Sequence, residues 1–390
     1  MAKNRLKTVK PTAKNLTLIQ KRARIWIPLL NRMISRWVKV SFSGQNNIPE
    51  NEPVLFLANH CSFFDPLLLG AAATKQVNFL ATESNFRNGI IGRFFVHHGA
   101  IPKMKYTSDA RAIISLKKWA NLGANIGIFP EGERTWDGKP LPVVSGTEKL
   151  VKLLDLPIVT LRIYNGFRQS PRWAKRLRVG RIHIEIDPPF KFDPKTSLIE
   201  IRKHIENHIA VDALNSPRFP VKGKSFSEGL SNVVWACPTC FKIDSLIEYT
   251  SRLTCSNCLK YWNIDCDANL LQQDQCFSLP QTIQKIQIHY KNELSGSFST
   301  PVSSEPLTLY NISDDRPRKV GSGSMRLTKD ELIVEGSLPW TMAIEDITTV
   351  TVDMRRRLTI RAGKKYFEVL TPTESVLKWE WFIKELKAST

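Results

Sequence analysis

The residues with the clearest chemical potential in this chain are His60 and Asp65, which lie five positions apart in the stretch "NHCSFFDP". An imidazole titrates near neutral pH and can take a proton from an attacking hydroxyl. A carboxylate that accepts a hydrogen bond from the other ring nitrogen fixes the tautomer and stabilises the protonated ring. The pair therefore predicts a general base with an orienting acid. The structural alternative is that Asp65, directly before Pro66, only caps a helix.

The elements around this pair indicate an α/β domain over residues 46–215, with a mostly parallel sheet covered by helices. Short apolar runs bounded by turn residues alternate with helical patterns such as Ser108–Leu122, and the runs fall at residues 53–58, 124–129 and 158–163. Ligands collect at the carboxyl ends of strands in such sheets. The polar residues after the first two runs can therefore share one site, although "FPEG" at 129–132 is also a plausible turn.

Together these segments resemble four ordered motifs of the glycerophospholipid acyltransferases, of the lysophosphatidate (1-acyl-sn-glycerol-3-phosphate) acyltransferase type. The resemblance covers about residues 15–215, and its motifs are Asn59-His60-x4-Asp65, "GAIPK" at 99–103, "FPEGERT" at 129–135 and "LPIVTL" at 156–161. It implies that this chain has the α/β fold of that family and moves a fatty acyl group from a thioester, acyl-CoA or acyl-carrier protein, to a lysophospholipid acceptor. The expected acceptor is lysophosphatidate and the expected product is phosphatidate.

The resemblance also implies roles for individual residues. His60 and Asp65 are expected to be catalytic. Because the thiolate leaving group permits direct transfer, no serine nucleophile is needed, and Cys61 is expected to face away from His60. The residues expected to bind the acceptor are Glu131, Gly132, Arg134 and Lys103.

Two positions depart from the family pattern and bear on the identity of the acceptor. The family usually has Thr or Ser where this chain has Glu133, and an arginine where this chain offers Lys103 or Lys105. From Arg162 to Arg181 there are seven basic residues and no acid. These could face lipid headgroups or coenzyme A phosphates, or form a solvated basic face.

Four cysteines predict a metal site. Two C-x-x-C pairs separated by fourteen residues have the spacing of a structural zinc ribbon, with the ligands Cys237, Cys240, Cys255 and Cys258. Four thiolates leave no open coordination position, so the Zn2+ is expected to be structural. Disulfides or a redox dithiol are the alternatives, and Cys266 and Cys276 are expected to be bystanders.

The net charge of +20 indicates an anionic partner, and residues 1–49 contain eleven Lys and Arg but no acid. Within residues 1–45, basic amphipathic helices divided at Pro28 are expected to lie on an anionic membrane surface, with a helix packed on the domain as the alternative. The apolar stripe includes Ile19, Ala23, Trp26, Leu30, Met33 and Trp37. The sequence has neither a secretion signal nor a membrane-spanning pattern, so a peripheral location on the cytoplasmic face is expected.

The remaining sequence suggests further modules. Residues 216–235 are expected to be a linker, 236–265 the zinc ribbon, and 266–305 a second linker around a short helix. Residues 306–390, with about seven short alternating segments and a final amphipathic helix, resemble a pleckstrin-homology (PH) or GRAM-like domain. A nucleic-acid-binding zinc-ribbon protein is a rival interpretation, but the ribbon is not notably basic, so no nucleic acid is expected. A catalytically inactive scaffold of the same fold is another alternative.

Overall fold

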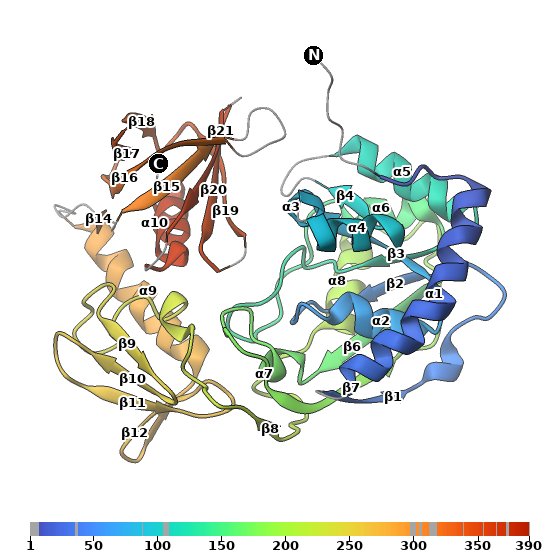
Figure 1. Cartoon of the computed structure of the whole chain (residues 1–390), viewed down its shortest axis with the longest axis horizontal. Helices are drawn as coiled ribbons and strands as arrows, with labels where there is room; N and C mark the ends of the chain where they lie inside the picture. Colours follow the sequence, from blue (N-terminus) through green and yellow to red (C-terminus); the bar gives the residue numbers. More distant parts are fainter. Residues whose placement is uncertain are drawn as a thin grey trace. The chain divides into compact units, whose positions relative to one another are not determined.

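The fold is described from a computed structural model that covers residues 8–35, 38–87, 89–103, 109–296, 302–303, 306–311, 318–337, 339–353, 355–363, 365–371 and 374–389. The chain divides into two compact units, which are described separately (Figure 1). The first unit contains Met1–Arg172 and Leu177–Lys222. The second contains Trp173–Arg176 and Gly223–Thr390. The boundary expected at residue 215 therefore falls inside the first unit.

The first unit is built on a mostly parallel sheet, as the sequence predicts. Its strand order is β1-β7-β6-β2-β5-β3-β4, with β8 paired to β7. The pairs β6·β7 and β7·β8 are antiparallel and the others are parallel. The strands are β1 (Val38–Ser43), β2 (Leu55–Ala58), β3 (Val77–Thr82), β4 (Ile101–Lys103), β5 (Asn125–Ile128), β6 (Ile158–Tyr164), β7 (Val179–Ile186) and β8 (Val221–Lys222).

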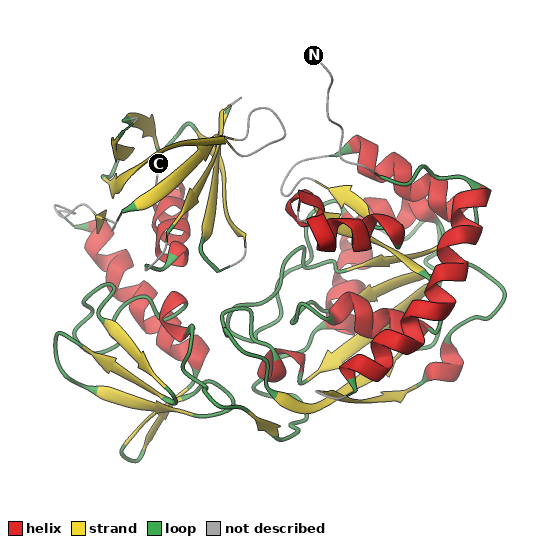
Figure 2. Cartoon of the chain, in the orientation of Figure 1, coloured by secondary structure: helices red, strands yellow, loops and turns green. Residues whose placement is uncertain are grey.

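Helices flank this sheet (Figure 2). The α-helices are α1 (Ala13–Ile34), α2 (Asp65–Ala73), α3 (Glu83–Arg87), α4 (Gly89–His97), α5 (Ala110–Asn121), α6 (Thr147–Leu154), α7 (Gly166–Gln169) and α8 (Leu198–Ile209). Helix α6 packs on α5 and α8. Helix α5 packs on β4 and β5, α8 packs on β2 and β6, and α1 packs on α2. Because the central strands are covered by helices, their sequences are continuously apolar rather than alternating.

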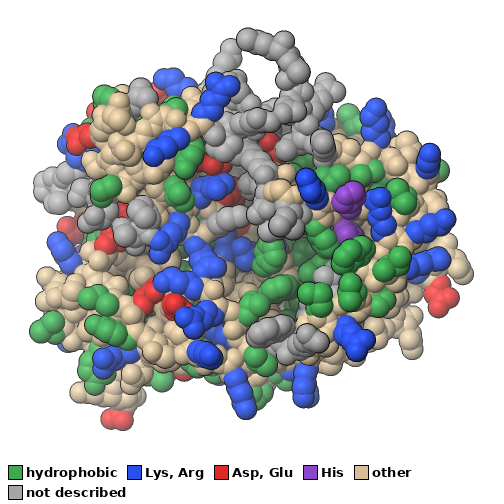
Figure 3. Space-filling model, in the orientation of Figure 1, with side chains coloured by type: hydrophobic (Ala, Val, Ile, Leu, Met, Phe, Trp, Pro, Cys, Tyr) green, Lys and Arg blue, Asp and Glu red, His purple; other side chains and the backbone are tan. Residues whose placement is uncertain are grey.

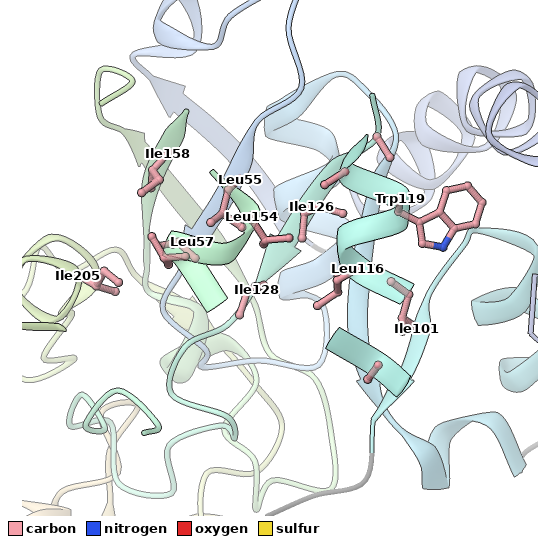
Figure 4. Packing of buried hydrophobic residues seen from close by; sticks show 14 of the residues in the cluster. Leu55, Leu57, Ile101, Leu116, Trp119, Ile126, Ile128, Leu154, Ile158 and Ile205 are labelled. Atoms are coloured by element: carbon pink, nitrogen blue, oxygen red, sulfur yellow. The ribbon is translucent and has the colours of Figure 1, made fainter. Parts of the chain in front are cut away.

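The core of the first unit lies between the sheet and α5, α6 and α8 (Figure 4). Leu55 and Leu57 of β2 and Ile126 of β5 are fully buried there, and Trp119 of α5 is 1% exposed. Burying such side chains is the main favourable term in folding. The packed strands therefore form a rigid support for the polar residues that follow β2 and β5.

Helix α1 differs from its sequence prediction. It continues through Pro28 as one helix, whereas Pro28 was expected to divide it. The first half packs on the domain, since Leu16, Ile19 and Ala23 are buried. In the second half, Trp26 is 43% exposed, and the other exposed apolar side chains include Ile25, Leu29 and Met33. The side chains of Leu30 and Trp37, which were also assigned to the apolar stripe, lie outside the described residues.

The second unit contains an antiparallel sheet next to the clustered cysteines, one of which, Cys255, ends a strand of the sheet. Its order is β13-β12-β11-β10-β9, with strands β9 (Leu246–Tyr249), β10 (Arg252–Cys255), β11 (Tyr261–Ile264), β12 (Leu270–Gln272) and β13 (Gln275–Phe277). Helix α9 (Leu279–Ser295) follows, with a capping box at Ser278. The described part of the segment 266–305, expected to be a linker around a short helix, thus contributes β12, β13, the two-residue strand β14 (Val302–Ser303) and a 17-residue helix.

A second antiparallel sheet follows, in the order β18-β17-β16-β15-β21-β20-β19, with β14 paired to β16. Its strands are β14 (Val302–Ser303), β15 (Leu307–Asn311), β16 (Arg318–Leu327), β17 (Glu331–Gly336), β18 (Trp340–Ala343), β19 (Ile347–Asp353), β20 (Arg357–Ala362) and β21 (Lys365–Leu370). Helix α10 (Val376–Ser389) packs on β19 and β20. The expected C-terminal β-rich fold with a closing helix is present.

Helix α10 also joins the two sheets of the second unit. The fully buried ammonium of Lys378 lies between the carboxylates of Asp244, in the cysteine-bearing region, and Glu374. The rings of Trp235 and Phe382 lie 5.5 Å apart, and the hydroxyl of Ser375 donates to the carbonyl of Asn232. The cysteine-bearing region and the C-terminal sheet therefore share one packed interior.

Candidate active site

His60 and Asp65 meet at the turn between β2 and α2. The Nδ1 atom of His60 lies 2.7 Å from Oδ2 of Asp65. Asp65 is fully buried, whereas the His60 side chain is 20% exposed. The ring of Phe129 stacks on the imidazole with 4.4 Å between the centroids. One imidazole nitrogen is thus held by a buried carboxylate, which leaves Nε2 as the nitrogen that can exchange a proton with a substrate.

The hydrogen bonds of Asp65 exclude the simple capping role considered above. Asp65 is the first residue of α2, and its carboxylate accepts from groups that precede it rather than from the helix. The donors are the backbone N–H groups of Cys61 and Ser62, at 2.7 and 2.8 Å, and the hydroxyl of Ser62, at 2.8 Å. The carboxylate therefore holds the turn through hydrogen bonds to residues 60–62, and His60 is part of that turn.

The loop after β5 is attached to the backbone of His60 at two points. The His60 N–H donates to Oε2 of Glu131 at 2.5 Å, and the Thr135 N–H donates to the His60 carbonyl at 3.2 Å. The second oxygen of Glu131 accepts from the N–H of Leu141 at 2.9 Å. Parallel pairing of β2 with β5 places both strand ends at one edge of the sheet. The structure thus brings the first and third sequence motifs together.

Gly132 and Arg134 lie in this loop. The Gly132 N–H donates to the Phe129 carbonyl, which closes the predicted turn. Gly132 has φ of +73°, and an added Cβ would lie 2.7 Å from the Val144 side chain, so the position requires glycine. Arg134 is half-buried, and its charge acts on His60. Both residues therefore belong to the same loop as the His60 anchor.

Lys103 lies farther along the same edge of the sheet. It is the last residue of β4, and the order β2-β5-β3-β4 places it three strands from β2. At about 4.8 Å per strand, that separation is about 14 Å. Burial lowers the pKa of the Lys103 ammonium, and the charge of Asp109 opposes this shift. Lys105, the alternative cation, lies outside the described residues.

Electrostatics around His60 favour its neutral form. Burial lowers the pKa of His60, the hydrogen bond and charge of Asp65 oppose this shift, and the charges of Arg134 and Arg172 lower the pKa further. Burial also raises the pKa of Glu131 to about 7, although two backbone N–H groups stabilise its charged form. A neutral imidazole at physiological pH can accept a proton without first losing one.

Cys61 is directed into the protein, toward Asp65 and the Ile163 carbonyl, which lie 3.7 and 4.0 Å from its sulfur. Burial raises the pKa of the Cys61 thiol well above its usual value. The thiol therefore stays protonated and is a poor nucleophile. A small cavity of about 10 Å³ beside Cys61 and His60 has room for about one water molecule, which is too little for a lipid.

The four predicted zinc ligands converge in the second unit. The sulfur atoms of Cys237, Cys240, Cys255 and Cys258 all lie within 4.8 Å of one another, and none of these cysteines is in a disulfide. Backbone N–H groups point at two of the sulfurs, from Thr239 and Cys240 to Cys237 and from Cys258 to Cys255. Such donors stabilise thiolates. The arrangement is compatible with one tetrahedral metal ion.

The basic run from Arg162 to Arg181 is neither a lipid-facing patch nor a solvated face along its whole length. Three of its arginines are buried, namely Arg168, Arg172 and Arg178. Arg162 is half-buried and pairs with Asp187, with 2.8 Å between the charged atoms. The run therefore supplies internal cations, and one of them reaches the candidate site.

Sequence reasoning missed that cation, Arg172. Its guanidinium lies 2.7 Å from the carboxylate of Glu133, donates to the Arg134 carbonyl at 3.0 Å and covers the ring of Trp136. Asn59 was quoted only as part of the histidine motif, yet its amide pairs with both backbone groups of Ile163 and so ties β2 to β6. Arg172 lies 38 residues after Arg134 and outside all four motifs, so no local signal identified it.

The helices and the surface charge of the chain bear on the membrane expectation. In the part of the chain that the structure describes, no helix is both long and apolar enough to cross a bilayer. Lys and Arg side chains outnumber Asp and Glu on the face shown in Figure 3.

Comparisons with known proteins agree with the first unit's geometry. Residues 39–164 match the model of the Acyltransferase family. A 1-acyl-sn-glycerol-3-phosphate acyltransferase from Borreliella burgdorferi is 28% identical over 137 residues, which are 34% of this chain and 55% of the relative. One from Chlamydomonas reinhardtii is 28% identical over 160 residues, which are 39% of this chain and 48% of the relative. The chain thus spans about half the length of these two relatives.

Among solved structures, the crystal structure of the 1-acyl-sn-glycerophosphate acyltransferase PlsC from Thermotoga maritima is 21% identical, with a TM-score of 0.39. The match covers 50% of this chain and 75% of that chain. The family match includes β2, β5 and the loops that carry His60, Asp65 and Glu131. The family match and these relatives therefore support an O-acyltransferase of the 1-acyl-sn-glycerol-3-phosphate acyltransferase type at residues 39–164.

Proposed function

We propose that this chain transfers a fatty acyl group from a thioester to the hydroxyl of a lysophospholipid. The observation that carries the proposal is the buried Asp65 carboxylate on Nδ1 of a partly exposed His60, inside a segment that matches the Acyltransferase family. Lysophosphatidate is the proposed acceptor and phosphatidate the product, as the names of the relatives suggest. The reaction would serve phospholipid biosynthesis.

In the proposed mechanism, Nε2 of His60 takes the proton of the acceptor hydroxyl as its oxygen attacks the thioester carbonyl. The C–O bond forms, the C–S bond breaks, and the donor leaves as a thiolate that takes the proton from the imidazolium. Asp65 holds the ring and stabilises its charged form. No residue of the chain is acylated, in keeping with a buried Cys61 whose pKa is raised by burial. The donor is acyl-CoA or an acyl-carrier-protein thioester.

The loop after β5 is the proposed acceptor site. The guanidinium of Arg134 would bind the acceptor phosphate through charge-assisted hydrogen bonds. Gly132 would let the backbone approach, and Glu131 would shape the loop through its bonds to the His60 and Leu141 N–H groups. Lys103, about 14 Å along the sheet edge, would bind a more distant part of the acceptor.

The experiment that tests the proposal is acyl transfer by the purified chain. Labelled acyl-CoA or acyl-carrier protein is offered with lysophosphatidate, other lysophospholipids or glycerol 3-phosphate. Label in phosphatidate that requires enzyme and lysophosphatidate is the expected result. Binding of every acceptor without transfer would instead favour the inactive scaffold, and transfer to a different acceptor would correct the substrate.

We propose that the exposed half of α1 lies on an anionic membrane surface, with the chain peripheral to the membrane's cytoplasmic face. Ile25 is 71% exposed and Met33 is 55% exposed, and the exposed apolar positions alternate with the basic Arg24 and Arg32. Replacing Trp26 and Met33 by glutamate should reduce flotation with anionic vesicles. The control is Ile199→Glu, which changes an apolar residue of α8 that is 80% exposed.

The second unit is proposed to hold one structural Zn2+ and to contain a PH- or GRAM-like domain. Four converging sulfurs and the backbone donors that face them support the metal. Bound zinc would fix the two cysteine turns in place, and four thiolates leave it no position for substrate. Seven strands from β15 to β21 followed by α10 support the domain assignment. No nucleic-acid partner is proposed.

A further inference from the structure

Glu133 creates a problem for the acceptor site proposed above. It lies directly before Arg134. The resemblance to the glycerophospholipid acyltransferases implies an uncharged hydroxyl residue at this position. A carboxylate next to a bound phosphate disfavours binding by like-charge repulsion. If this loop binds a phosphorylated acceptor, the charge of Glu133 must be compensated by another part of the chain.

Arg172 provides that compensation. Its Nη1 atom lies 2.7 Å from Oε2 of Glu133. The Arg172 side chain is 4% exposed and that of Glu133 is 22% exposed, so the pair is largely shielded from solvent. Shielding strengthens the attraction between opposite charges. Glu133 and Arg172 therefore act as one nearly neutral unit.

Arg172 also fixes the backbone from which Arg134 projects. The same Nη1 atom donates to the Arg134 carbonyl at 3.0 Å, and the guanidinium lies 3.9 Å from the centre of the Trp136 ring. On the other side, the N–H of Thr135 is bound to the His60 carbonyl. The peptide group between Arg134 and Thr135 is thus held at both its oxygen and its nitrogen.

We propose that Arg172 is a positioning residue for the acceptor phosphate. It offsets the charge of Glu133 and holds the Arg134 backbone in register with His60, so that Glu133 opposes phosphate binding less and Arg134 is presented in a fixed geometry. This inference rests on the proposed function, in which Arg134 binds the phosphate. It also accounts for the departure at residue 133, because the glutamate and the arginine form one compensated pair.

The test measures KM and kcat for lysophosphatidate with acyl-CoA as donor in the Arg172→Gln variant. The expected result is a KM for lysophosphatidate raised by about tenfold, the equivalent of about 1.4 kcal/mol, with the KM for acyl-CoA unchanged. A merely structural defect would lower the folded fraction and hence the apparent kcat, but would leave the KM of the remaining folded enzyme unaltered. Thermal unfolding of each variant is recorded alongside.

A second variant separates charge from geometry. Adding Glu133→Gln to Arg172→Gln removes the carboxylate that has lost its bond to Arg172 and should recover part of the lost acceptor affinity. Arg172→Lys keeps the charge but lacks the planar group that reaches the carboxylate, the carbonyl and the indole together, so it should restore less than full affinity. The matched control is Arg181→Gln, an exposed arginine of the same basic run.

Two outcomes would overturn the inference. One is an unchanged KM for lysophosphatidate in Arg172→Gln, and the other is an equal rise in the KM values of acceptor and donor. Failure of the proposed function looks different, because the wild-type chain itself would then transfer no acyl group to lysophosphatidate.

Discussion

The His60 turn and the cysteine cluster are both short motifs at the ends of strands, yet they have opposite designs. In the first unit, one side of the His60 ring is satisfied by Asp65 and the ring remains partly exposed. In the second unit, four sulfurs face one another, so each position around a bound ion would be taken by the protein. The two sites thus show two arrangements. At the His60 turn one ring nitrogen has no hydrogen-bond partner among the residues that the structure describes and can meet a substrate, whereas four thiolates would fill every coordination position of a tetrahedral ion.

Replacing His60 at the first site should have the largest effect on activity. His60→Ala is expected to reduce acyl transfer by at least roughly 10²–10⁴-fold, the usual contribution of a general base. Folding should be unaffected, because the ring is at a strand end and not in the core. The assay uses lysophosphatidate and acyl-CoA, and His97→Ala, which changes an exposed histidine, is the control. Wild-type turnover in His60→Ala would refute the mechanism.

Asp65→Asn is the companion variant, and it should also be severely impaired. The amide cannot stabilise the imidazolium, and if its oxygen kept the Oδ2 position on His60, its NH2 group would face the Ser62 hydroxyl and the Cys61 sulfur. Hydrogen exchange of residues 60–65 reports whether the turn persists. Loss of transfer with a protected turn would assign Asp65 a catalytic function beyond its structural one.

Removal of metal should affect only the second site. A chelator is expected to loosen the second unit, including α9 and α10, because both helices pack on the cysteine-bearing region. Hydrogen exchange measures this, and metal analysis of the native chain should find one zinc. Cys255→Ser should reproduce the chelator effect, whereas Cys276→Ser, at an exposed cysteine outside the cluster, should not. Native protein without zinc would disprove the metal assignment.

Replacing Lys378 tests how much its ion pairs between α10 and the cysteine-bearing region contribute to the stability of the second unit. Lys378→Met leaves the buried Glu374 carboxylate and Asp244 without their shared cation, which should cost about 3–5 kcal/mol of unfolding free energy. Urea unfolding monitored by the tryptophans of the second unit measures the loss. Lys384→Met removes the cation of a pair on the same helix in which Lys384 is 57% exposed and Glu380 is 10% exposed, and it should cost less than Lys378→Met because Lys384 is in contact with solvent. Equal losses in the two variants would contradict the proposed link.

Arg134 tests substrate binding at the open site. Arg134→Ala should weaken lysophosphatidate binding by about 1.5–3 kcal/mol, the cost of a charge-assisted hydrogen bond. The readout is the KM for lysophosphatidate, with the KM for acyl-CoA as the internal control. An unchanged KM would mean that Arg134 does not bind the phosphate. Lys103, at the same edge of the sheet, would then be the next residue to replace.

The smallest effect is a shift in pH dependence. In the proposed mechanism the neutral form of His60 is the base, so kcat/KM should fall as pH drops through its pKa, and burial places that midpoint below the usual value of about 6.5. Arg134→Ala removes a charge that lowers the pKa, so the midpoint should rise. Residual activity in Asp65→Asn should show a lower midpoint. A midpoint that stays constant in both variants would show that another group controls the acid limb.

The local motifs could be predicted from the sequence because their chemistry depends on neighbours in the chain. Apolar runs at 53–58 and 124–129 are strands because they bury both faces. His60 and Asp65 are close enough in sequence for one turn to bring them together, and the C-x-x-C pairs each form within a single turn. For such contacts, residue type and spacing are sufficient information.

Tertiary structure decided the features that depend on distant partners. Arg172 reaches Glu133 across 39 positions of chain, and Lys378 reaches Asp244 across 134. Trp26 is partly exposed because only the first half of α1 packs on the domain. The basic run looked like a surface by composition, yet Arg168 and Arg178 are buried because carbonyl groups of the folded chain accept their hydrogen bonds. Long-range partners have no periodicity in sequence, so only the packed fold reveals them.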